Sequence, residues 1–255
     1  PAVQVAMGRV ICSSLLLLLI SLFCKDKLTL NCKKDYGLMI MTGLVMAIHW
    51  SSFFQSIQTS SVAIGTITFS TFPLFLTFLE PLIFHEKIRG KNILNALILL
   101  LGVLITIPEF SVENKVTVGI LWGMLASVTY AVMTLSNRYF SSRYKGRTIC
   151  LYEQGTAAIA LLPALVLVKA TWRPVDFAGV ATIGFLCTAI AYSLYVTAQK
   201  GVKAQTAGII SGMETVYGIV FALLFLREVP TIRELVGGAV ILGIAFYSSL
   251  HSDDD

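Results

Sequence analysis

Long runs of apolar residues, separated by short polar connectors, dominate the pattern of this chain. About 20 apolar residues are needed for a helix to cross the hydrocarbon core of a bilayer. Nine runs approach or exceed that length, and we predict spans at Val3–Cys24, Gly37–Ile57, Ser61–Phe84, Asn92–Ile107, Val118–Asn137, Thr148–Leu167, Phe177–Ala198, Thr206–Leu226 and Leu235–Leu250. The runs lack the alternation of barrel strands, and an open sheet would leave backbone groups unpaired in lipid. We therefore predict an all-α integral membrane protein.

The composition supports this prediction. The chain has 255 residues, of which 56% are hydrophobic and 13% charged, and its mean hydropathy is +0.81. A soluble domain has about 25% charged residues. The net charge of +5 does not indicate a nucleic-acid partner, because the basic residues lie in short connectors. The five cysteines show no CxxC spacing, so we expect no structural disulfide, no metal site and no cofactor.

The connectors alternate in basic charge. One set of alternate connectors contains 13 Lys and Arg residues and the other set contains 5, while Arg9 lies inside the first predicted span. The positive-inside rule places the richer set in the cytoplasm. The multi-pass chain is then expected to start outside the plasma (cell inner) membrane and to end in a cytoplasmic tail, residues 251–255. A start outside also fits a first helix that precedes Pro1.

Two stretches of the chain repeat one pattern. Residues 60–102 and 201–243 each begin with small residues, continue as a long apolar helix, reach a glutamate and end in a short helix with a terminal glycine. Glu86 aligns with Glu228, and Gly102 aligns with Gly243. Five spans separate the two copies, and an odd offset means that they cross the membrane in opposite directions. Inverted repeats of this kind are typical of secondary transporters, which bind substrate near the midplane.

The motifs that carry this repeat resemble a known family. The first half contains "FPLFLTFLEPLIFHEKI", preceded by a helix that begins between Pro1 and Arg9, and the second contains "TAIAYSLYVTAQKGVKAQTAGIISGMETVYGIVFALLFLRE". Over nearly the whole chain these features are similar to the drug/metabolite transporters with paired EamA domains. The family typically has Glu-Pro in the last helix, where this chain has Glu214-Thr215. The resemblance implies a ten-helix inverted repeat that moves small metabolites by alternating access.

The repeat also divides the chain into expected domains. We expect a first EamA repeat at residues 1–108, lacking its first helix, and a second repeat at residues 118–250. With five helices in each repeat, nine of the ten would be visible in this chain.

Polar residues inside the spans are candidates for substrate contact. A charged side chain near the bilayer centre costs about 2.5–3.5 kcal/mol on insertion scales, so it is a functional suspect. Glu214 is the main candidate, because it lies roughly 13 Å into its predicted helix at 1.5 Å per residue. Glu153 lies nearer the end of its span and ranks below it. The predicted substrate-binding set is completed by an aromatic group of residues: His49, Trp50, Tyr130, Tyr192 and Tyr217.

Each of these candidates has a structural alternative. A carboxyl such as Glu214 can serve helix packing, and a mid-membrane histidine such as His49 can be a buried hydrogen-bond donor or a proton relay. If the aromatic faces meet, the cavity would suit a zwitterion or a cation through cation–π contact. Pro73 is a candidate bend, because it removes one backbone hydrogen bond. Glu86 and Glu228, at helix ends, are candidate gates or interfacial ion pairs.

The predicted function is secondary transport of a small organic metabolite, amino-acid-like or related, with coupling to protons or to a counter-substrate left open. One alternative is uptake or exchange of S-adenosylmethionine or a nucleoside-like metabolite, which the resembled family also includes. A second is an intramembrane enzyme or sensor. Against an enzyme, "HEKIR" lacks the second histidine of HExxH, and no GxSxG or Walker loop is present. The expected partners are a small-molecule substrate and the bilayer.

Overall fold

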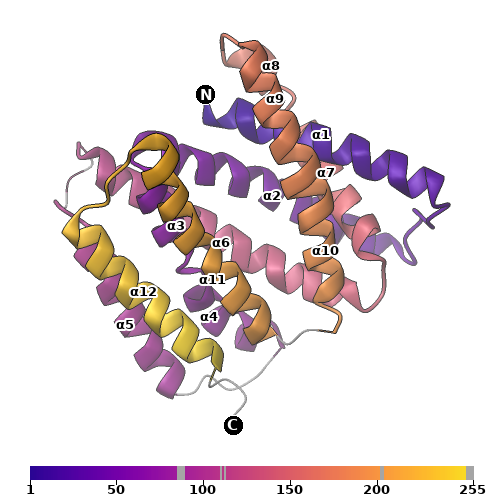
Figure 1. Ribbon diagram of the computed structural model, residues 1–255. Helices are drawn as coiled ribbons and strands as arrows, with labels where there is room; N and C mark the ends of the chain where they lie inside the picture. The colour runs from indigo at the N-terminus through magenta and orange to yellow at the C-terminus, as the bar shows by residue number, and fades with distance from the viewer. Residues whose placement is uncertain (85–89, 110, 112, 202–203, 251–255) are drawn as a thin grey trace. The chain divides into compact units, whose positions relative to one another are not determined.

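The computed structural model describes the chain except for residues 85–89, 110, 112, 202–203 and 251–255 (Figure 1). Throughout this described part, the regular structure is helical and contains no strand. The chain divides into two compact units, each built from two separate segments. The first unit comprises Pro1–Ser51 and Val132–Gly201, and the second comprises Ser52–Ala131 and Val202–Asp255. The predicted all-α class is confirmed.

Two long helices, α2 (Lys33–Thr59) and α6 (Lys115–Ser141), continue along the chain from one unit into the other. The remaining helices of the first unit are α1 (Ala2–Phe23), α7 (Gly146–Leu161), α8 (Ala164–Leu167), α9 (Pro174–Thr182), the π-helix η1 (Ile183–Ile190) and α10 (Ala191–Ala198). Those of the second unit are α3 (Val62–Phe69), α4 (Phe72–Phe84), α5 (Gly90–Thr106), α11 (Ala204–Phe221), the π-helix η2 (Ala222–Leu226) and α12 (Ile232–Leu250).

Six continuous stretches of helix are long and apolar enough to cross a bilayer. They are Ala2–Phe23, Lys33–Thr59, Val62–Ile83, Lys115–Ser141, Gly146–Leu167 and Pro174–Ala198. Two shorter apolar helices, Ile93–Thr106 and Met213–Leu226, occur among the residues searched. The multi-pass membrane fold is therefore confirmed, while the count of nine spans stays a prediction.

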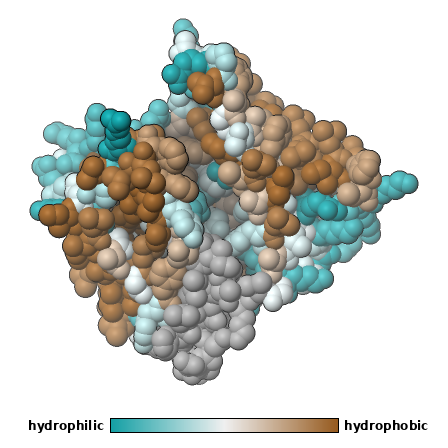
Figure 2. Space-filling view, viewed as in Figure 1, coloured by the Kyte–Doolittle hydropathy of each residue, from teal (hydrophilic) through white to brown (hydrophobic). Residues whose placement is uncertain are grey.

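Apolar side chains cover much of the surface that Figure 2 shows, as broad brown areas. Among the exposed side chains are Leu19 of α1, Leu97 of α5 and Phe225 of η2. Contiguous apolar surface of this extent is unfavourable in water and marks an interaction surface. In a helical membrane protein the acyl chains of the lipid cover it, so these side chains are the lipid-facing sides of their helices.

Helices that the internal repeat aligns pack directly on each other. Helices α5 and α12 correspond to the fourth and ninth predicted spans, and they form the most extensive helix pair in the second unit. A Cβ atom built on Gly102 would lie 2.7 Å from the Ile241 side chain, and one built on Gly237 would lie 2.7 Å from the Gly102 carbonyl oxygen. Small residues permit this close backbone approach. In the first unit, α1 packs along α7, which correspond to the first and sixth spans.

The predicted third span, Ser61–Phe84, is divided in two. Helix α3 ends at Phe69, and α4 begins at Phe72, one residue before Pro73. Ser61 caps α3, with its side chain accepting a hydrogen bond from the backbone N–H of Ile64. The bend expected at Pro73 therefore lies at Ser70–Thr71, because proline is tolerated in the first turn of a helix but not in its interior.

Contacts between connectors join segments that the charge count places on the same side. Asp26, after α1, forms ion pairs with Lys145 and Arg147. Lys145 is the last residue before α7, and Arg147 is the second residue of α7. On the opposite predicted side, the Arg233 guanidinium donates to the carbonyl oxygens of Ile107 and Pro108. Each contact joins connectors of the same predicted set, while the side of the membrane that either set faces stays a prediction.

Candidate functional site

The predicted substrate-binding residues divide between the two units. His49, Trp50 and Tyr192 belong to the first unit, whereas Tyr130, Glu214 and Tyr217 belong to the second. His49, Trp50, Tyr130 and Tyr192 are buried, while Glu214 and Tyr217 are exposed on α11. Each group is best understood within its own unit.

The first unit contains a buried arginine that the candidate set did not include. Arg9 lies in the third turn of α1 and is only 8% exposed. Its guanidinium carbon lies 3.3 Å from the ring centroid of Trp50, and its Nε donates to the hydroxyl of Thr188. A cation over the face of a tryptophan is stabilised by the ring quadrupole, and most strongly where both are removed from water. One cation partner of Trp50 is therefore an arginine of the protein itself.

The position of Thr188 depends on an irregular helix. Thr188 lies in η1, where the wider π-helical turn lets its hydroxyl donate to the carbonyl of Ile183, five residues earlier, at 2.9 Å. The same oxygen accepts from Arg9. Single π-turns inside helices occur frequently at functional sites. The local backbone of η1 thus helps to place a hydrogen-bond acceptor against the only arginine of α1.

A second buried polar group surrounds Glu153 of α7. Glu153 is completely buried, and its Oε2 accepts a hydrogen bond of 3.3 Å from the hydroxyl of Tyr192 on α10. The Tyr192 hydroxyl in turn accepts a 2.8 Å hydrogen bond from the side-chain amide of Asn137 on α6. Three helices therefore contribute one chain of hydrogen bonds, Asn137 to Tyr192 to Glu153.

Several polar atoms beside these hydrogen bonds have no partner among the described residues. Oε1 of Glu153, Oδ1 of Asn137 and both amide atoms of the neighbouring Gln154 are buried without a hydrogen-bond partner in the described part of the chain. Buried polar groups in proteins are nearly always hydrogen-bonded, so each exception needs an explanation. A cluster of such atoms on α6 and α7 is the arrangement expected of a site that receives a polar ligand or water.

Sequence reasoning ranked Glu153 below Glu214 and did not include Arg9 among the candidates. The available signal was the same in each case, a charge inside an apolar run. Depth along the helix separates Glu214 from Glu153, but depth does not show which face of a helix meets its neighbours. The structure gives that information: Arg9 and Glu153 face the interior of the first unit, whereas Glu214 is exposed on α11.

In the second unit, Tyr130 belongs to an aromatic cluster. Its ring makes edge contacts with Phe69 and Phe72, at centroid distances of 4.9 and 5.0 Å. These two phenylalanines are the last residue of α3 and the first residue of α4. Tyr130 therefore packs against the break in the third span, which gives it a structural role beside its predicted role in substrate contact.

Hydroxyl groups replace the backbone hydrogen bonds lost at this break. Pro73 has no N–H to donate to the carbonyl of Phe69, four residues earlier. The hydroxyl of Ser127 on α6 supplies that donor at 2.8 Å and also lies 2.9 Å from the Thr68 carbonyl. Thr71 donates to Ser127 at 3.0 Å. The bend at Pro73 is thus satisfied from a neighbouring helix, as a proline in a membrane helix requires.

Thr215 of α11 contacts the same break. Its hydroxyl donates to the carbonyl of Thr66 at 3.0 Å and also bonds the hydroxyl of Ser70. Aligning Glu86 with Glu228 pairs Pro73 with Thr215, since each lies 13 residues before its glutamate. The departure from the family's Glu-Pro pattern therefore places a hydroxyl, in one repeat, against the proline break of the other.

Of the two predicted gate residues, Glu228 has a clear contact. Its carboxylate accepts a 3.0 Å hydrogen bond from the backbone N–H of Val62, the first residue of α3. A carboxylate at a helix N-terminus satisfies an otherwise unpaired donor and complements the helix dipole. Glu228 thus links the end of η2 to the start of α3. Glu86 lies outside the described residues.

Taken together, these features define a class of protein: an integral membrane protein with repeated helical architecture and buried, ionisable side chains inside its spans. Within the described residues, no group of three or more His, Cys, Asp or Glu could hold a metal ion. The chain belongs to the EamA-like transporter family, whose model matches residues 1–107 and 117–250.

Relatives from several organisms are similar over most of the chain. An uncharacterized transporter of Archaeoglobus fulgidus is 24% identical and aligns with 83% of this chain and 77% of its own length. Uncharacterized transporters of Clostridium kluyveri and Helicobacter pylori are 26% and 27% identical, over 91% and 92% of this chain and 77% and 80% of their own lengths. One solved crystal structure matches with a TM-score of 0.70 at 15% identity, covering 98% of this chain and 87% of that one. This last likeness concerns the fold alone.

Proposed function

We propose that the protein is a secondary carrier for a small, carboxylate-bearing organic metabolite of the amino-acid-like class. The observation that carries the proposal is the pair of buried ionisable side chains in the first unit, Arg9 and Glu153, inside the spans of a transporter-family protein. Insertion scales assign a cost of about 2.5–3.5 kcal/mol to each such charge, so both are expected to serve the function.

Arginine is suited to a carboxylate ligand. Its planar guanidinium presents five N–H donors, and one of them, on Nε, is directed to Thr188. A carboxylate can take two parallel hydrogen bonds from such a group. On the other side, Glu153 with Tyr192 and Gln154 offers acceptors and donors that fit an ammonium or a proton. The first unit therefore contains groups of both signs for a zwitterionic substrate.

The alternative substrate, an S-adenosylmethionine-like or nucleoside-like cation, is less well supported. That hypothesis uses the aromatic rings for cation–π contact with the substrate. Arg9 already lies over the ring of Trp50, and a second cation beside it would meet like-charge repulsion. The enzyme or sensor alternative gains no additional support from the described site.

Alternating access is proposed to bend the third span at the Ser70–Thr71 break. A hydroxyl of α6 covers the Phe69 carbonyl, which lacks the Pro73 donor, and a hydroxyl of α11 bonds the Thr66 carbonyl. Hydroxyls can exchange between neighbouring carbonyls more readily than backbone ladders can. We further propose that the chain lies in the plasma membrane with its C-terminus in the cytoplasm, as the distribution of basic residues predicts.

The proposed function is tested by counterflow in liposomes. Purified protein is reconstituted into vesicles loaded with one unlabelled amino acid or related carboxylate, and uptake of the labelled compound is followed without ATP. Transient accumulation above equilibrium is the expected result for at least one zwitterionic compound. Compounds that differ only by esterification of the carboxylate serve as matched controls, and they should not accumulate. Accumulation of cationic nucleosides in place of carboxylates would contradict the proposal.

A further inference from the structure

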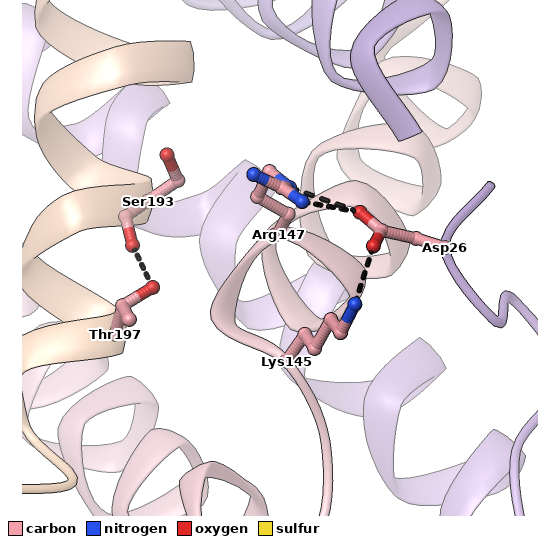
Figure 3. A network of polar contacts seen from close by, with 5 residues as sticks. All are labelled: Asp26, Lys145, Arg147, Ser193 and Thr197. Carbon is pink, nitrogen blue, oxygen red and sulfur yellow. Dashed lines mark hydrogen bonds and ion pairs between the residues drawn. The ribbon is translucent and has the colours of Figure 1, made fainter. Parts of the chain in front are cut away.

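A cavity of about 430 Å³ lies in the first unit, where the connector between α6 and α7 meets the end of α10. Four basic side chains line it, together with three hydroxyl residues and Tyr144: the basic residues are Arg143, Lys145, Arg147 and Lys200, and the hydroxyl residues are Ser141, Ser142 and Thr197. Figure 3 shows Lys145 and Arg147 directed toward Asp26, with Ser193 and Thr197 on the neighbouring helix. This cavity is separate from the residues of the proposed transport site.

The acidic partners of these basic residues leave an excess of positive charge. Asp26 lies 2.7 Å from Lys145 and 2.8 Å from Arg147, and Asp35 lies 3.6 Å from Arg143. Both carboxylates are essentially buried, with 0% and 2% of their side-chain surface exposed, whereas the three basic side chains remain 37–67% exposed. Lys200 adds a fourth cation. Two carboxylates behind four cations leave a net charge of about +2 at the cavity wall.

The donors available to a ligand are the cations and a helix start. The hydroxyls of Ser141, Ser142 and Thr197 donate to backbone carbonyls of their own helices. Helix α7 starts at Gly146, and its N-cap, Lys145, makes no side-chain capping hydrogen bond. The first N–H groups of a helix lack intrahelical partners, and the helix dipole favours an anion there. Gly146 is required, because a Cβ atom would lie 2.9 Å from the backbone nitrogen of Thr197.

We propose that this cavity binds the phosphate group of an anionic ligand, held by Arg143, Lys145, Arg147 and Lys200 at the start of α7. Two sources of that chemistry are the headgroup of an anionic phospholipid and a soluble phosphate. The lipid source fits the position of the cavity, because its connectors lie on the side that is predicted to be cytoplasmic. Basic pockets between membrane helices on that side bind anionic headgroups.

The test measures binding of two probes to the purified full-length chain in neutral detergent. Phosphatidylglycerol binding is titrated by native mass spectrometry, and inorganic phosphate binding by isothermal calorimetry. Lys200→Gln and Arg143→Gln each remove one cation and leave the Asp26 ion pairs in place. Each is expected to weaken binding by about fivefold, and the double variant by about 25-fold, since one basic residue near a headgroup contributes on that scale.

The matched control is Lys27→Gln, which removes an exposed lysine from the connector that also contains Asp26, without altering the cavity lining. It is expected to change binding by less than about twofold, because exposed charges at a distance are screened. Equal losses in Lys27→Gln and Lys200→Gln would overturn the proposal, since they would show general attraction to a basic surface. So would equal affinity of the wild type and the double variant for both probes.

The two probes also distinguish the source. Loss of phosphatidylglycerol binding with no phosphate binding in any form assigns the cavity to a lipid headgroup, whereas the reverse assigns it to a soluble phosphate. Thermal unfolding without either probe checks that the variants fold. If Arg143→Gln unfolds early, Lys200→Gln alone carries the comparison, because the Arg143–Asp35 contact remains in that variant. Counterflow activity is not part of this test, so its outcome is independent of the proposed transport function.

Discussion

The two units bury different kinds of polar side chain. The interior of the first unit contains charged, amide and imidazole groups, of which Arg9, Glu153, Gln154 and His49 are examples. Among the described spans of the second unit, the buried polar side chains are mostly small hydroxyls, including Thr68, Ser70, Thr71, Ser127 and Thr215. Charged side chains recognise ligands and carry protons, whereas short hydroxyls exchange hydrogen bonds with the backbone.

From this difference we infer that the first unit recognises the substrate and that the second unit contains the helix that bends. In the first unit, buried polar atoms remain without partners around Glu153, as a ligand site requires. In the second unit, hydroxyls bond the backbone carbonyls around the break before Pro73, including the Phe69 carbonyl that lacks the Pro73 donor. The following predictions test whether changes in the first unit affect transport and changes in the second unit affect helix stability.

The largest expected effect is that of Glu153→Gln. The amide keeps the shape of the carboxyl and can still accept from Tyr192, but it cannot carry a charge or a proton. We expect counterflow to fall roughly 100-fold, because the variant loses the buried, charge-assisted hydrogen bond that Glu153 is proposed to make with the substrate. Circular dichroism should show unchanged helical content.

Glu214→Gln is the matched comparison for that variant. The hypothesis drawn from the sequence predicts the same loss when Glu214, the exposed carboxyl of α11, is neutralised. A loss confined to Glu153→Gln assigns recognition to the first unit. A loss confined to Glu214→Gln would contradict the proposed division, as would comparable losses in the two variants.

Arg9→Lys is expected to have the next largest effect. Lysine keeps the positive charge but lacks the planar fork that stacks on Trp50 and donates to Thr188. Counterflow of a carboxylate substrate should fall about tenfold, mainly through a higher KM, because bidentate recognition is lost. Arg9→Gln, which also removes the charge, should lose more. Equal rates for wild type and both variants would remove Arg9 from the site.

In the second unit, Ser127→Ala should reduce stability rather than substrate recognition. The change leaves the Phe69 carbonyl without its hydroxyl donor, at a cost of about 1–3 kcal/mol in the free energy of unfolding. The Thr68 carbonyl keeps the backbone N–H and the hydroxyl of Thr71. In a Pro73→Ala background the Phe69 carbonyl can regain a backbone donor, so the same substitution should cost less. A thermal-unfolding double-mutant cycle measures this coupling.

Ser14→Ala supplies the control for that cycle. Ser14 donates to the carbonyl of Ile11 within its own helix, so its loss leaves no carbonyl at a helix break unpaired. We expect a change within about 0.5 kcal/mol. If Ser127→Ala and Ser14→Ala were equally mild, or if Pro73→Ala made no difference to Ser127→Ala, the proposed role of Ser127 at the break would be wrong.

The sequence was sufficient to predict the fold class, because the fold class depends mainly on whether lipid or water surrounds the helices. Apolar runs of about 20 residues have few alternatives to membrane helices. The alignment of residues 60–102 with 201–243 was also informative, since α5 and α12, the helices at its ends, pack closely through Gly102 and Gly237. Both inferences use the length of apolar runs and the order of small and acidic residues along the chain, which do not depend on how the helices are rotated.

The polar contacts could not be predicted in the same way. The hydrogen bond between Glu153 and Tyr192 depends on the rotation of α7 and α10 about their axes, and apolar runs with polar residues on several faces leave that rotation undetermined. The location of the break in the third span illustrates the same limit. Pro73 predicted a bend, but the position of the break, before the proline, depends on Ser127, which lies 54 residues further along the chain.

The smallest expected effect concerns Asp26, in the connector of the first unit. Hydrogen bonds from Lys145 and Arg147 lower the pKa of Asp26 below its usual value. A lowered folded-state pKa contributes stability above the unfolded value of about 3.9, and that contribution is lost as the pH falls through the folded-state pKa. Asp26→Asn should therefore lower the free energy of unfolding by about 1 kcal/mol at neutral pH, since its partners are partly exposed.

The pH dependence separates this ion pair from a packing effect. Thermal unfolding of wild type and Asp26→Asn should differ at about pH 7. The difference should begin to shrink below about pH 4 and vanish as the pH falls through the lowered folded-state pKa, where the wild-type carboxyl is protonated as well. Glu113→Gln, at an exposed position of a connector in the second unit, should follow the wild type throughout. A constant difference between wild type and Asp26→Asn across this range would show that Asp26 acts through packing. It would also show that the charge of Asp26 does not position Lys145 and Arg147 at the cavity of the first unit.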